Sequence, residues 1–145
     1  EEVIVTETDE GDNDATHLSR IQKLKQFTSA VKSKRSYEFI QDVVDGEEKI
    51  VVFTEYIATT ESIKEHFEDC AVVFTGKKNM NEKQEAVDKF MNDKNTSVFI
   101  GTNGAAGVGI TLTSSSILLF IDKPWTPADV EQCYSRIFRL GSTAE

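Results

Sequence analysis

Two arginines and a glutamine near the end of the sequence share the spacing of one helix face. If this segment is helical, Gln132, Arg136 and Arg139 lie within about 60° of one another, at roughly 100° per residue. The opposite side of the helix then carries an apolar stripe, formed by Val130, Cys133 and Ile137. Two guanidinium groups in adjacent turns repel each other, so the spacing favours a bound anion. A solvated polar face is the other interpretation, and it is the commoner reason for arginines on a helix.

A second group of candidate residues lies where four predicted strands end. The strand ends read Thr54-Glu55-Tyr56, Thr75-Gly76-Lys77, Gly101-Thr102-Asn103 and Asp122-Lys123-Pro124-Trp125. In open α/β sheets, ligands bind beyond the carboxyl ends of the strands. Small, polar and glycine-rich ends suit a phosphate backbone that lies along this edge. From the pattern alone, polar residues that simply terminate strands are the commoner explanation.

Short apolar strands that alternate with helices would position these residues. Strands are predicted at residues 50–54, 71–75, 97–101 and 117–121. Each run is apolar almost throughout and rich in β-branched or aromatic residues, which is typical of strands covered on both faces. Alternation with helices favours a parallel sheet, so the predicted fold class is α/β, a three-layer sandwich with a mostly parallel sheet.

Helix starts and stops follow from local signals. A long amphipathic helix is predicted over residues 17–35, with residues 38–44 as a second helical piece. Residues 101–109 are small and are expected to form a loop or a short helix. Three further helix starts are predicted from capping residues, namely Thr59-Thr60, Asn81 with Gln84, and Thr126 followed by Pro127.

The composition is that of one globular domain preceded by an acidic segment. The 145 residues are 39% hydrophobic and 28% charged, close to the globular average. No stretch reaches the roughly 18 apolar residues that a membrane span needs, so no membrane contact is expected. The net charge of −9 argues against a free-standing nucleic-acid binder, but acidic residues crowd the beginning of the chain. We expect an acidic linker over residues 1–16 and a folded domain over residues 17–145.

The two cysteines give an expectation about the redox setting, and the chain ends give one about whether the sequence is a fragment. Cys70 and Cys133 lack C-x-x-C spacing and have no histidines at metal-ligand spacing, so we expect buried free thiols and no metal site. Free thiols indicate a reducing, intracellular setting, either bacterial cytoplasm and nucleoid or a eukaryotic nucleus. The sequence begins without Met and stops just after the candidate helix, which leads us to expect an excised fragment.

No phosphate-binding loop of the Walker A type occurs in the sequence. Gly76-Lys77 lacks the upstream glycine and the following Ser or Thr that this loop requires. Ile121-Asp122 resembles the end of a Walker B strand, but Lys123 follows where a catalytic acid would be needed. Alone, the chain is not expected to hold a triphosphate with magnesium.

The motifs of the second half resemble those of the Swi/Snf-related ATPases of helicase superfamily 2. Three segments carry the likeness, and they correspond to motif V, the Trp-x-Pro segment and motif VI: Gly107-Val108-Gly109-Ile110-Thr111-Leu112-Thr113, Pro124-Trp125-Thr126-Pro127, and Gln132 with Arg136-Ile137-Phe138-Arg139-Leu140-Gly141. Upstream, residues 50–56 resemble motif IV, and Thr75-Gly76 with Lys83 and Phe90 resembles the next block. The sequence departs from the family at Thr111, Phe138 and Ser142, where Asn, His and Gln are common.

The resemblance implies a RecA-like fold and a role for the last helix. The chain would be the second, C-terminal lobe of a two-lobe ATPase, with motifs IV to VI in residues 17–145. Arg136 and Arg139 would be catalytic at the cleft between the lobes, where an arginine stabilises charge on the transferred phosphoryl group. Gln132, Gly107 and Gly109 would contribute to nucleotide binding. ATP and Mg²⁺ would be bound mainly by the N-terminal lobe.

The same resemblance assigns nucleic-acid contacts to the sheet edge and to motif V. The residues concerned are Thr54, Thr75, Gly76, Lys77, Thr102 and Thr111. Hydroxyls and backbone N–H groups of this kind position phosphates without reading the base sequence. The expected partners are double-stranded DNA and the N-terminal lobe of the same polypeptide.

The function implied is half of a DNA-stimulated ATPase that translocates on DNA or remodels protein–DNA complexes. A strand-separating helicase lobe for DNA or RNA is the first alternative, and a non-catalytic nucleic-acid-binding module is the second. The fold class alone also allows a flavodoxin-like nucleotide binder, for which Thr54-Glu55-Tyr56 would be a poor phosphate loop.

Overall fold

The computed structural model describes residues 14–138 and contains a parallel sheet of four strands. The strands lie in the order β2-β3-β1-β4, and their bounds are Ile50–Thr54 (β1), Ala71–Phe74 (β2), Val98–Thr102 (β3) and Ile117–Phe120 (β4). All pairings in this sheet are parallel, as the sequence predicted. Every residue of β1 is buried, because β1 is a central strand with a neighbour on each side and helices on both faces.

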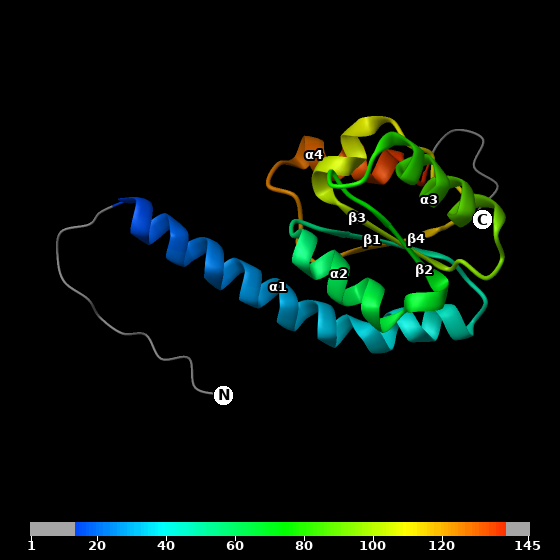
Figure 1. Cartoon of the computed structure of the whole chain (residues 1–145), viewed down its shortest axis with the longest axis horizontal. Helices are drawn as coiled ribbons and strands as arrows, with labels where there is room; N and C mark the ends of the chain where they lie inside the picture. Colours follow the sequence, from blue (N-terminus) through cyan, green and yellow to red (C-terminus); the bar gives the residue numbers. More distant parts are fainter. Residues whose placement is uncertain (1–13, 139–145) are drawn as a thin grey trace.

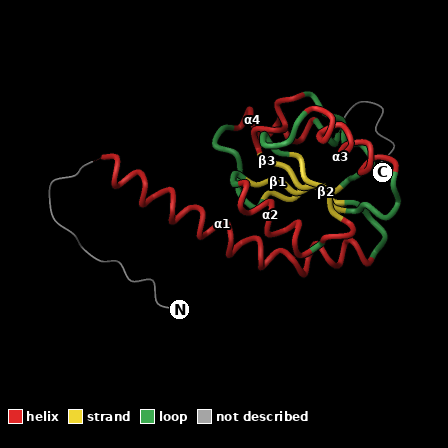
Figure 2. The backbone as a smooth tube through the Cα atoms, viewed as in Figure 1, coloured by secondary structure: helices red, strands yellow, loops and turns green. Residues whose placement is uncertain are grey.

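Helices cover both faces of the sheet (Figures 1 and 2). On one face, α1 (Asp14–Asp45) and α2 (Ile57–His66) contribute Ile40, Val43 and Ile63 to a core that includes Val52 of β1. The other face is covered by α3 (Met80–Asn92), the 3₁₀ helix η2 (Asn103–Val108) and α4 (Pro127–Ser135). A further 3₁₀ turn, η1, occupies Glu68–Cys70. The three-layer α/β prediction is confirmed.

The first helix differs from the prediction in length. The sequence predicted two pieces that begin after an acidic linker, whereas α1 is one helix of 32 residues that begins at Asp14. No Gly or Pro occurs between residues 14 and 45, so nothing in this segment interrupts the backbone hydrogen bonds of the helix. The C-terminal part of α1 packs on the sheet through Ile40 and Val43, while its N-terminal part extends beyond the body (Figure 1).

Two of the three predicted helix caps are wrong. In α2 the predicted cap residues are buried inside the helix, and in α3 another asparagine forms the capping box. Tyr56 is the N-cap of α2, and Thr59 and Thr60 lie inside that helix with buried side chains. For α3, the capping box forms between Asn79 and Glu82, two residues earlier than predicted. The Asn79 side chain accepts a hydrogen bond from the Glu82 N–H (2.9 Å), and the Glu82 carboxylate accepts one from the Asn79 N–H (2.8 Å).

The third cap is confirmed. Thr126 accepts a hydrogen bond from the Asp129 N–H (3.1 Å), and Pro127 occupies the first position of α4, where its missing N–H costs nothing. Of the apolar stripe predicted for this helix, Cys133 is fully buried and Val130 is half-buried, while the fully buried Ile137 lies just beyond the helix end at Ser135.

The corrected capping box gives the first testable prediction. Asn79→Ala should lower the free energy of unfolding by about 1 kcal/mol, because it removes the acceptor for an N-terminal N–H of α3. The matched control is Asn81→Ala, which replaces an exposed residue within the same turn and should change stability by less than about 0.5 kcal/mol. Urea unfolding of both variants measures the difference, and equal losses would refute the assignment of the cap.

Candidate functional site

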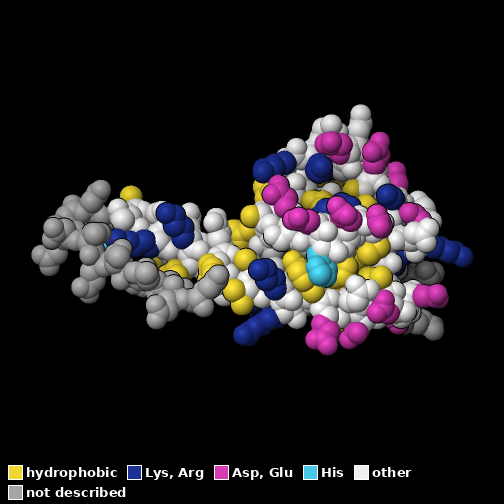
Figure 3. Space-filling model, turned by 60° about the horizontal axis from the view of Figure 1, so that its bottom comes forward, with side chains coloured by type: hydrophobic (Ala, Val, Ile, Leu, Met, Phe, Trp, Pro, Cys, Tyr) yellow, Lys and Arg dark blue, Asp and Glu magenta, His cyan; other side chains and the backbone are white. Residues whose placement is uncertain are grey.

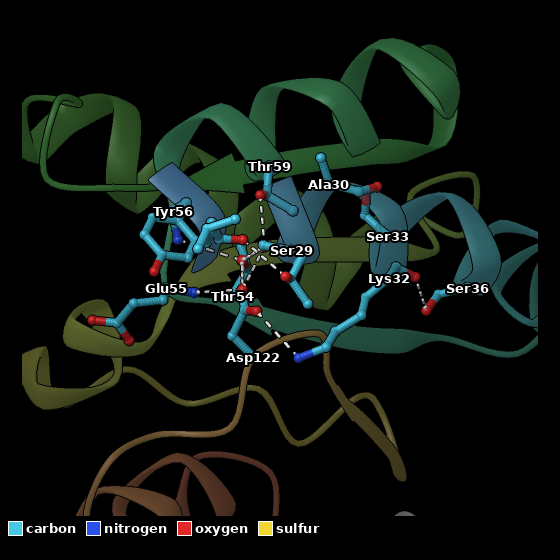
Figure 4. A network of polar contacts seen from close by, with 12 residues as sticks. Ser29, Ala30, Lys32, Ser33, Ser36, Thr54, Glu55, Tyr56, Thr59 and Asp122 are labelled. Atoms are coloured by element: carbon cyan, nitrogen blue, oxygen red, sulfur yellow. Dashed lines mark hydrogen bonds and ion pairs between the residues drawn. The ribbon is translucent and has the colours of Figure 1, made fainter. Parts of the chain in front are cut away.

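The carboxylate of Asp122, just after β4, joins three elements at the carboxyl edge of the sheet (Figure 4). Its Oδ2 atom accepts hydrogen bonds from the hydroxyls of Ser29 (2.6 Å) and Thr54 (2.7 Å) and from the Glu55 N–H (3.3 Å). Its other oxygen lies 3.9 Å from the ammonium of Lys32. Asp122 therefore fixes α1 and the end of β1 to the segment that follows β4.

Hydroxyl groups continue this network into the protein. Because Ser29 gives its proton to Asp122, the 2.8 Å contact between Ser29 and Thr59 is a hydrogen bond that Thr59 donates. Thr59 lies within α2, so the network ties that helix to the edge as well. Ser29, Thr54 and Thr59 are each at most 3% exposed. A buried polar group is costly unless it is hydrogen-bonded. Here Ser29 and Thr54 donate to the Asp122 carboxylate, and Thr59 donates to Ser29.

Burial of Thr54 bears on its predicted contact with nucleic acid. Its side chain is fully buried, and its hydroxyl proton is directed to Asp122. In this conformation the Thr54 hydroxyl holds the edge together, and it does not donate to a phosphate outside the protein. Thr75 is also buried (2% exposed). The exposed members of the predicted set are Gly76 and Lys77, and Thr102 and Thr111 are half-buried.

The side-chain amide of Asn103, the first residue of η2, links the segment that resembles motif V to two strands. Its Nδ2 donates to the Glu55 carboxylate (2.8 Å) and to the Asp122 carbonyl (3.1 Å). Asn103 is 9% exposed, and its Oδ1 has no hydrogen-bond partner among the described residues. The amide orientation is determined, since both neighbouring groups are acceptors. Thr102, one residue earlier, is paired with Thr54 in the β3–β1 ladder.

The segment that resembles motif V is packed against the one that resembles motif VI. The Leu112 N–H donates to the Arg136 carbonyl (2.8 Å), and Leu112, Cys133 and Ile137 are fully buried together. Gly109 ends η2 with φ +76°, a left-handed conformation that suits glycine. Gly107 lies within η2. This packing fixes the backbone of Arg136 relative to the sheet edge.

Two of the three residues predicted to contact an anion lie at the C-terminal end of α4. Gln132 is exposed and Arg136, the C-cap residue, is half-buried, and Cys133 and Ile137 occupy the buried side. The prediction assumed one helix that continues through Arg139, whereas α4 ends at Ser135 and residues 136–138 form a turn, so the shared helix face does not form as predicted. Arg139 lies outside the described residues.

Lysines gather beyond β2, at the opposite border of the sheet from Asp122. A hollow of about 260 Å³ between α2 and the start of α3 is lined in part by Lys64, Lys77 and Lys78. Lys77 is 67% exposed and lies 3.7 Å from the Glu61 carboxylate. Exposed ammonium groups beside Gly76 can contact phosphates, because their side chains reach solvent freely.

Sequence reasoning missed three residues of this edge. Ser29 and Thr59 lie within helices and carry no local signal, and Asn103 was noted only as part of a strand end. Among the described residues, no group of three or more His, Cys, Asp or Glu side chains could hold a metal ion. No helix between residues 14 and 138 is long and apolar enough to cross a membrane.

Comparisons with known proteins agree with the resemblance of the motifs. The helicase conserved C-terminal domain family matches residues 31–141. An uncharacterized ATP-dependent helicase of Mycoplasma pneumoniae is 28% identical over 130 residues, which cover 86% of this chain and 13% of that protein. The ATP-dependent helicase FUN30 of Saccharomyces cerevisiae is 29% identical over 106 residues, which cover 71% of this chain and 9% of that protein.

A solved structure extends the likeness to three dimensions. The Sulfolobus solfataricus SWI2/SNF2 ATPase core in complex with double-stranded DNA has a TM-score of 0.69 and 26% sequence identity. The match covers 87% of this chain and 30% of that one. The present chain therefore corresponds to a small part of its relatives.

Loss of the Asp122 carboxylate should destabilise the fold. Asp122→Ala leaves two buried hydroxyls without their acceptor, so we expect the free energy of unfolding to fall by about 1–3 kcal/mol. Lys32→Ala is the control, because an ion pair with a half-exposed lysine contributes about 0–1 kcal/mol. Thermal and urea unfolding report both values. A loss for Asp122→Ala no larger than that of the control would contradict the role given to this carboxylate.

The Cys133 thiol should be unreactive in the folded protein. Burial raises its pKa from the ordinary 9.0 to about 11, and the neighbouring Asp129 carboxylate adds to the rise. Between these pH values the thiol ionises in the unfolded chain but not in the folded one, so its contribution to stability is lost as pH rises from 9 to 11. Thiol labelling at pH 8 should modify Cys133 only after denaturation, and rapid labelling of the native protein would refute this.

Proposed function

Because this chain belongs to the helicase conserved C-terminal domain family, as the RecA-like lobe of a SWI2/SNF2-type ATPase, we propose that it is the C-terminal motor lobe of a DNA-stimulated ATPase. In this function, ATP hydrolysis is coupled to translocation on DNA or to its remodelling. One observation carries the proposal. The polar edge of the sheet is joined to the segment around Arg136 by Asn103 and by the Leu112–Arg136 hydrogen bond, so a change at the edge can alter the position of Arg136.

The carboxyl edge supplies the proposed track for DNA. Gly76 and Lys77 offer a backbone N–H and an ammonium group, and Thr102 and Thr111 add half-buried hydroxyls. Such groups bind phosphates of any sequence, as a motor that moves along DNA requires. Thr54 and Thr75, whose side chains are buried, would contribute to the track only through their backbone groups. The double-stranded DNA bound by the Sulfolobus core makes duplex DNA the proposed substrate here.

Gln132 of α4, Arg136 at the C-cap of that helix and Arg139 three residues later in the sequence supply the proposed contact with ATP. Arg136, Arg139 and Gln132 are a cationic and amide donor set, which matches the γ-phosphate of a nucleotide held by another lobe. ATP and Mg²⁺ would be held mainly by the N-terminal lobe, while Gly107 and Gly109 let the backbone of motif V approach the same cleft.

The native two-lobe polypeptide is the material for the test. Arg139→Ala should lower the ATPase rate at saturating ATP and DNA by about 10³-fold or more, because it removes a donor to charge that develops on the phosphoryl group. Arg136→Ala should act in the same direction. Arg139→Lys should restore little, since an ammonium group cannot replace the planar fork of donors.

The control for this test is Lys94→Ala, an exposed site after α3, which should leave turnover unchanged. Thermal unfolding of each preparation, with a change within about 0.5 kcal/mol of the parent, identifies the variants whose fold is intact. Near-normal turnover by a stable Arg139→Ala protein would refute the catalytic assignment.

A further inference from the structure

Most of α1 is basic in a chain that is acidic as a whole. Residues 15–37 contain six Lys or Arg and no Asp or Glu, although the whole chain has a net charge of −9. The N-terminal part of this helix extends beyond the body (Figure 1). Figure 3 shows basic and hydrophobic side chains along α1, with acidic side chains gathered over the body. The protruding part of α1 therefore differs in charge from the surface of the body.

One face of this basic segment has the spacing of a coiled-coil seam. Ile21, Leu24, Thr28 and Val31 follow one another at steps of three, four and three residues. These are the a and d positions of a heptad repeat, through which one helix packs on another. Ile21, Leu24 and Val31 are 48%, 55% and 37% exposed, so the large apolar side chains of the seam face solvent.

Thr28 suits a dry interface although its side chain carries a hydroxyl. This hydroxyl donates a hydrogen bond to the Leu24 carbonyl (2.8 Å), one turn earlier in the same helix. A polar group is costly to bury when it loses its hydrogen bonds, and this one keeps its partner within α1. A second helix can therefore cover the Thr28 methyl group without leaving the hydroxyl unpaired.

The side of α1 that packs on the body is a different one. Ser29 and Ser33 occupy b and f positions of the same heptads, and both are buried. The Ser29 hydroxyl also donates to the Asp122 carboxylate (2.6 Å). Positions b and f lie across the helix from a and d, at about 100° per residue. The contacts around Asp122 therefore hold α1 with its seam turned away from the sheet.

A groove of about 430 Å³ runs beside the seam. It is lined by seam residues of α1 on one side and by Tyr56 and Trp125 on the other. Trp125 is 75% exposed, and the ammonium of Lys25 lies 3.8 Å from the centre of its ring. Grooves with apolar walls bind amphipathic helices, whose anchoring side chains repeat at the same steps of three and four residues.

Basic residues flank the seam on both sides. The e and g positions of the heptads are occupied by Arg20, Lys25, Phe27, Lys32 and Lys34. Residues at these positions set the choice of partner through charge pairs between helices. A second copy of α1 would bring lysines close to lysines, whereas Asp or Glu at the facing positions would pair with them. The flanks therefore favour an acidic helix over self-association.

We propose that the seam and the groove beside it form the docking site for an amphipathic α-helix of a partner protein. The helix that fits has apolar residues at its own a and d positions and Asp or Glu at e and g. Its apolar side chains pack on the seam and against Trp125, and its acids pair with Lys25 and Lys34. The groove contains none of the residues proposed above to contact DNA or ATP, so docking does not depend on that function.

An anionic membrane would attract the same basic and apolar residues, but the shape of the site favours a helix. The seam spans about two heptads and forms the wall of a groove. A helix with its side chains is about 10 Å across and fits beside such a wall. A helix that binds a membrane instead lies flat in the interface with its whole apolar face free, which the Trp125 side of the groove prevents.

Fluorescence of Trp125 reports on docking, because it is the only tryptophan of the chain and lies in the groove wall. The probe is a synthetic peptide of about four heptads with Ile at a, Leu at d and Glu at e and g, and the control peptide has Lys at e and g. The Glu peptide should bind the 145-residue chain at low salt and protect Trp125 from quenching by acrylamide. Binding should weaken by about 10-fold or more at high salt, where charge pairs are screened. The Lys peptide should not bind.

Variants of α1 then identify the surface. Ile21→Ser combined with Leu24→Ser should weaken binding of the Glu peptide by about 10-fold or more, because two apolar anchors are lost. Lys25→Glu combined with Lys34→Glu should abolish binding of the Glu peptide and create binding of the Lys peptide, which a loss of structure would not do. Lys23→Glu is the matched control. It makes the same charge change at a c position away from the seam and should keep the affinity within about 3-fold.

Several results would overturn the docking site. The Glu peptide could leave Trp125 unprotected up to about 1 mM, both peptides could bind equally, or all variants could bind the Glu peptide alike. Trp125 that becomes protected as the parent chain alone is concentrated would assign the seam to a second copy. Binding to phosphatidylserine and phosphatidylcholine vesicles, without binding of the Glu peptide, would assign it to a membrane. Either assignment replaces the partner helix.

Discussion

The Asp122 carboxylate is the contact on which the carboxyl edge of the sheet depends. The ladder between β1 and β4 runs from Ile50 and Ile117 to Phe53 and Phe120, so backbone pairing ends just before this carboxylate. Beyond that point, the hydroxyls of Ser29 and Thr54 hold the chain in place of a ladder. Each donor is satisfied only because the acceptor is there, and the acceptor is tolerated inside only because of its donors.

A second set of contacts connects the carboxyl edge of the sheet to α4. Asn103 binds the Asp122 carbonyl with its side chain, and its own carbonyl lies 4.0 Å from the Cys133 sulfur. Leu112 then holds the Arg136 carbonyl through its N–H. The carboxyl edge of the sheet and α4 are therefore parts of one packed unit, so a displacement of one is transmitted to the other through these contacts.

The charges of this lobe are distributed unevenly along the chain, so the net charge does not describe each part of its surface. A chain at −9 would repel DNA if its charges were spread evenly. Here residues 1–13 carry a net charge of −6 of the total of −9, and residues 15–37 carry six Lys or Arg and no Asp or Glu. The field over the lysines beyond β2 is consequently more positive than the net charge suggests, since exposed charges farther away than about 8 Å are largely screened at physiological salt.

The sequence by itself determined the four strands, their parallel sheet and the Thr126 cap, because buried β-branched runs and capping residues act within a few positions of the chain. It also identified the motif residues, although Arg139 lies outside the described part of the chain. Only the tertiary structure decided that Thr54 and Thr59 turn inward. Their partner Ser29 is 93 residues from Asp122 in sequence, and no local pattern encodes a contact that exists only when α1 packs beside β1.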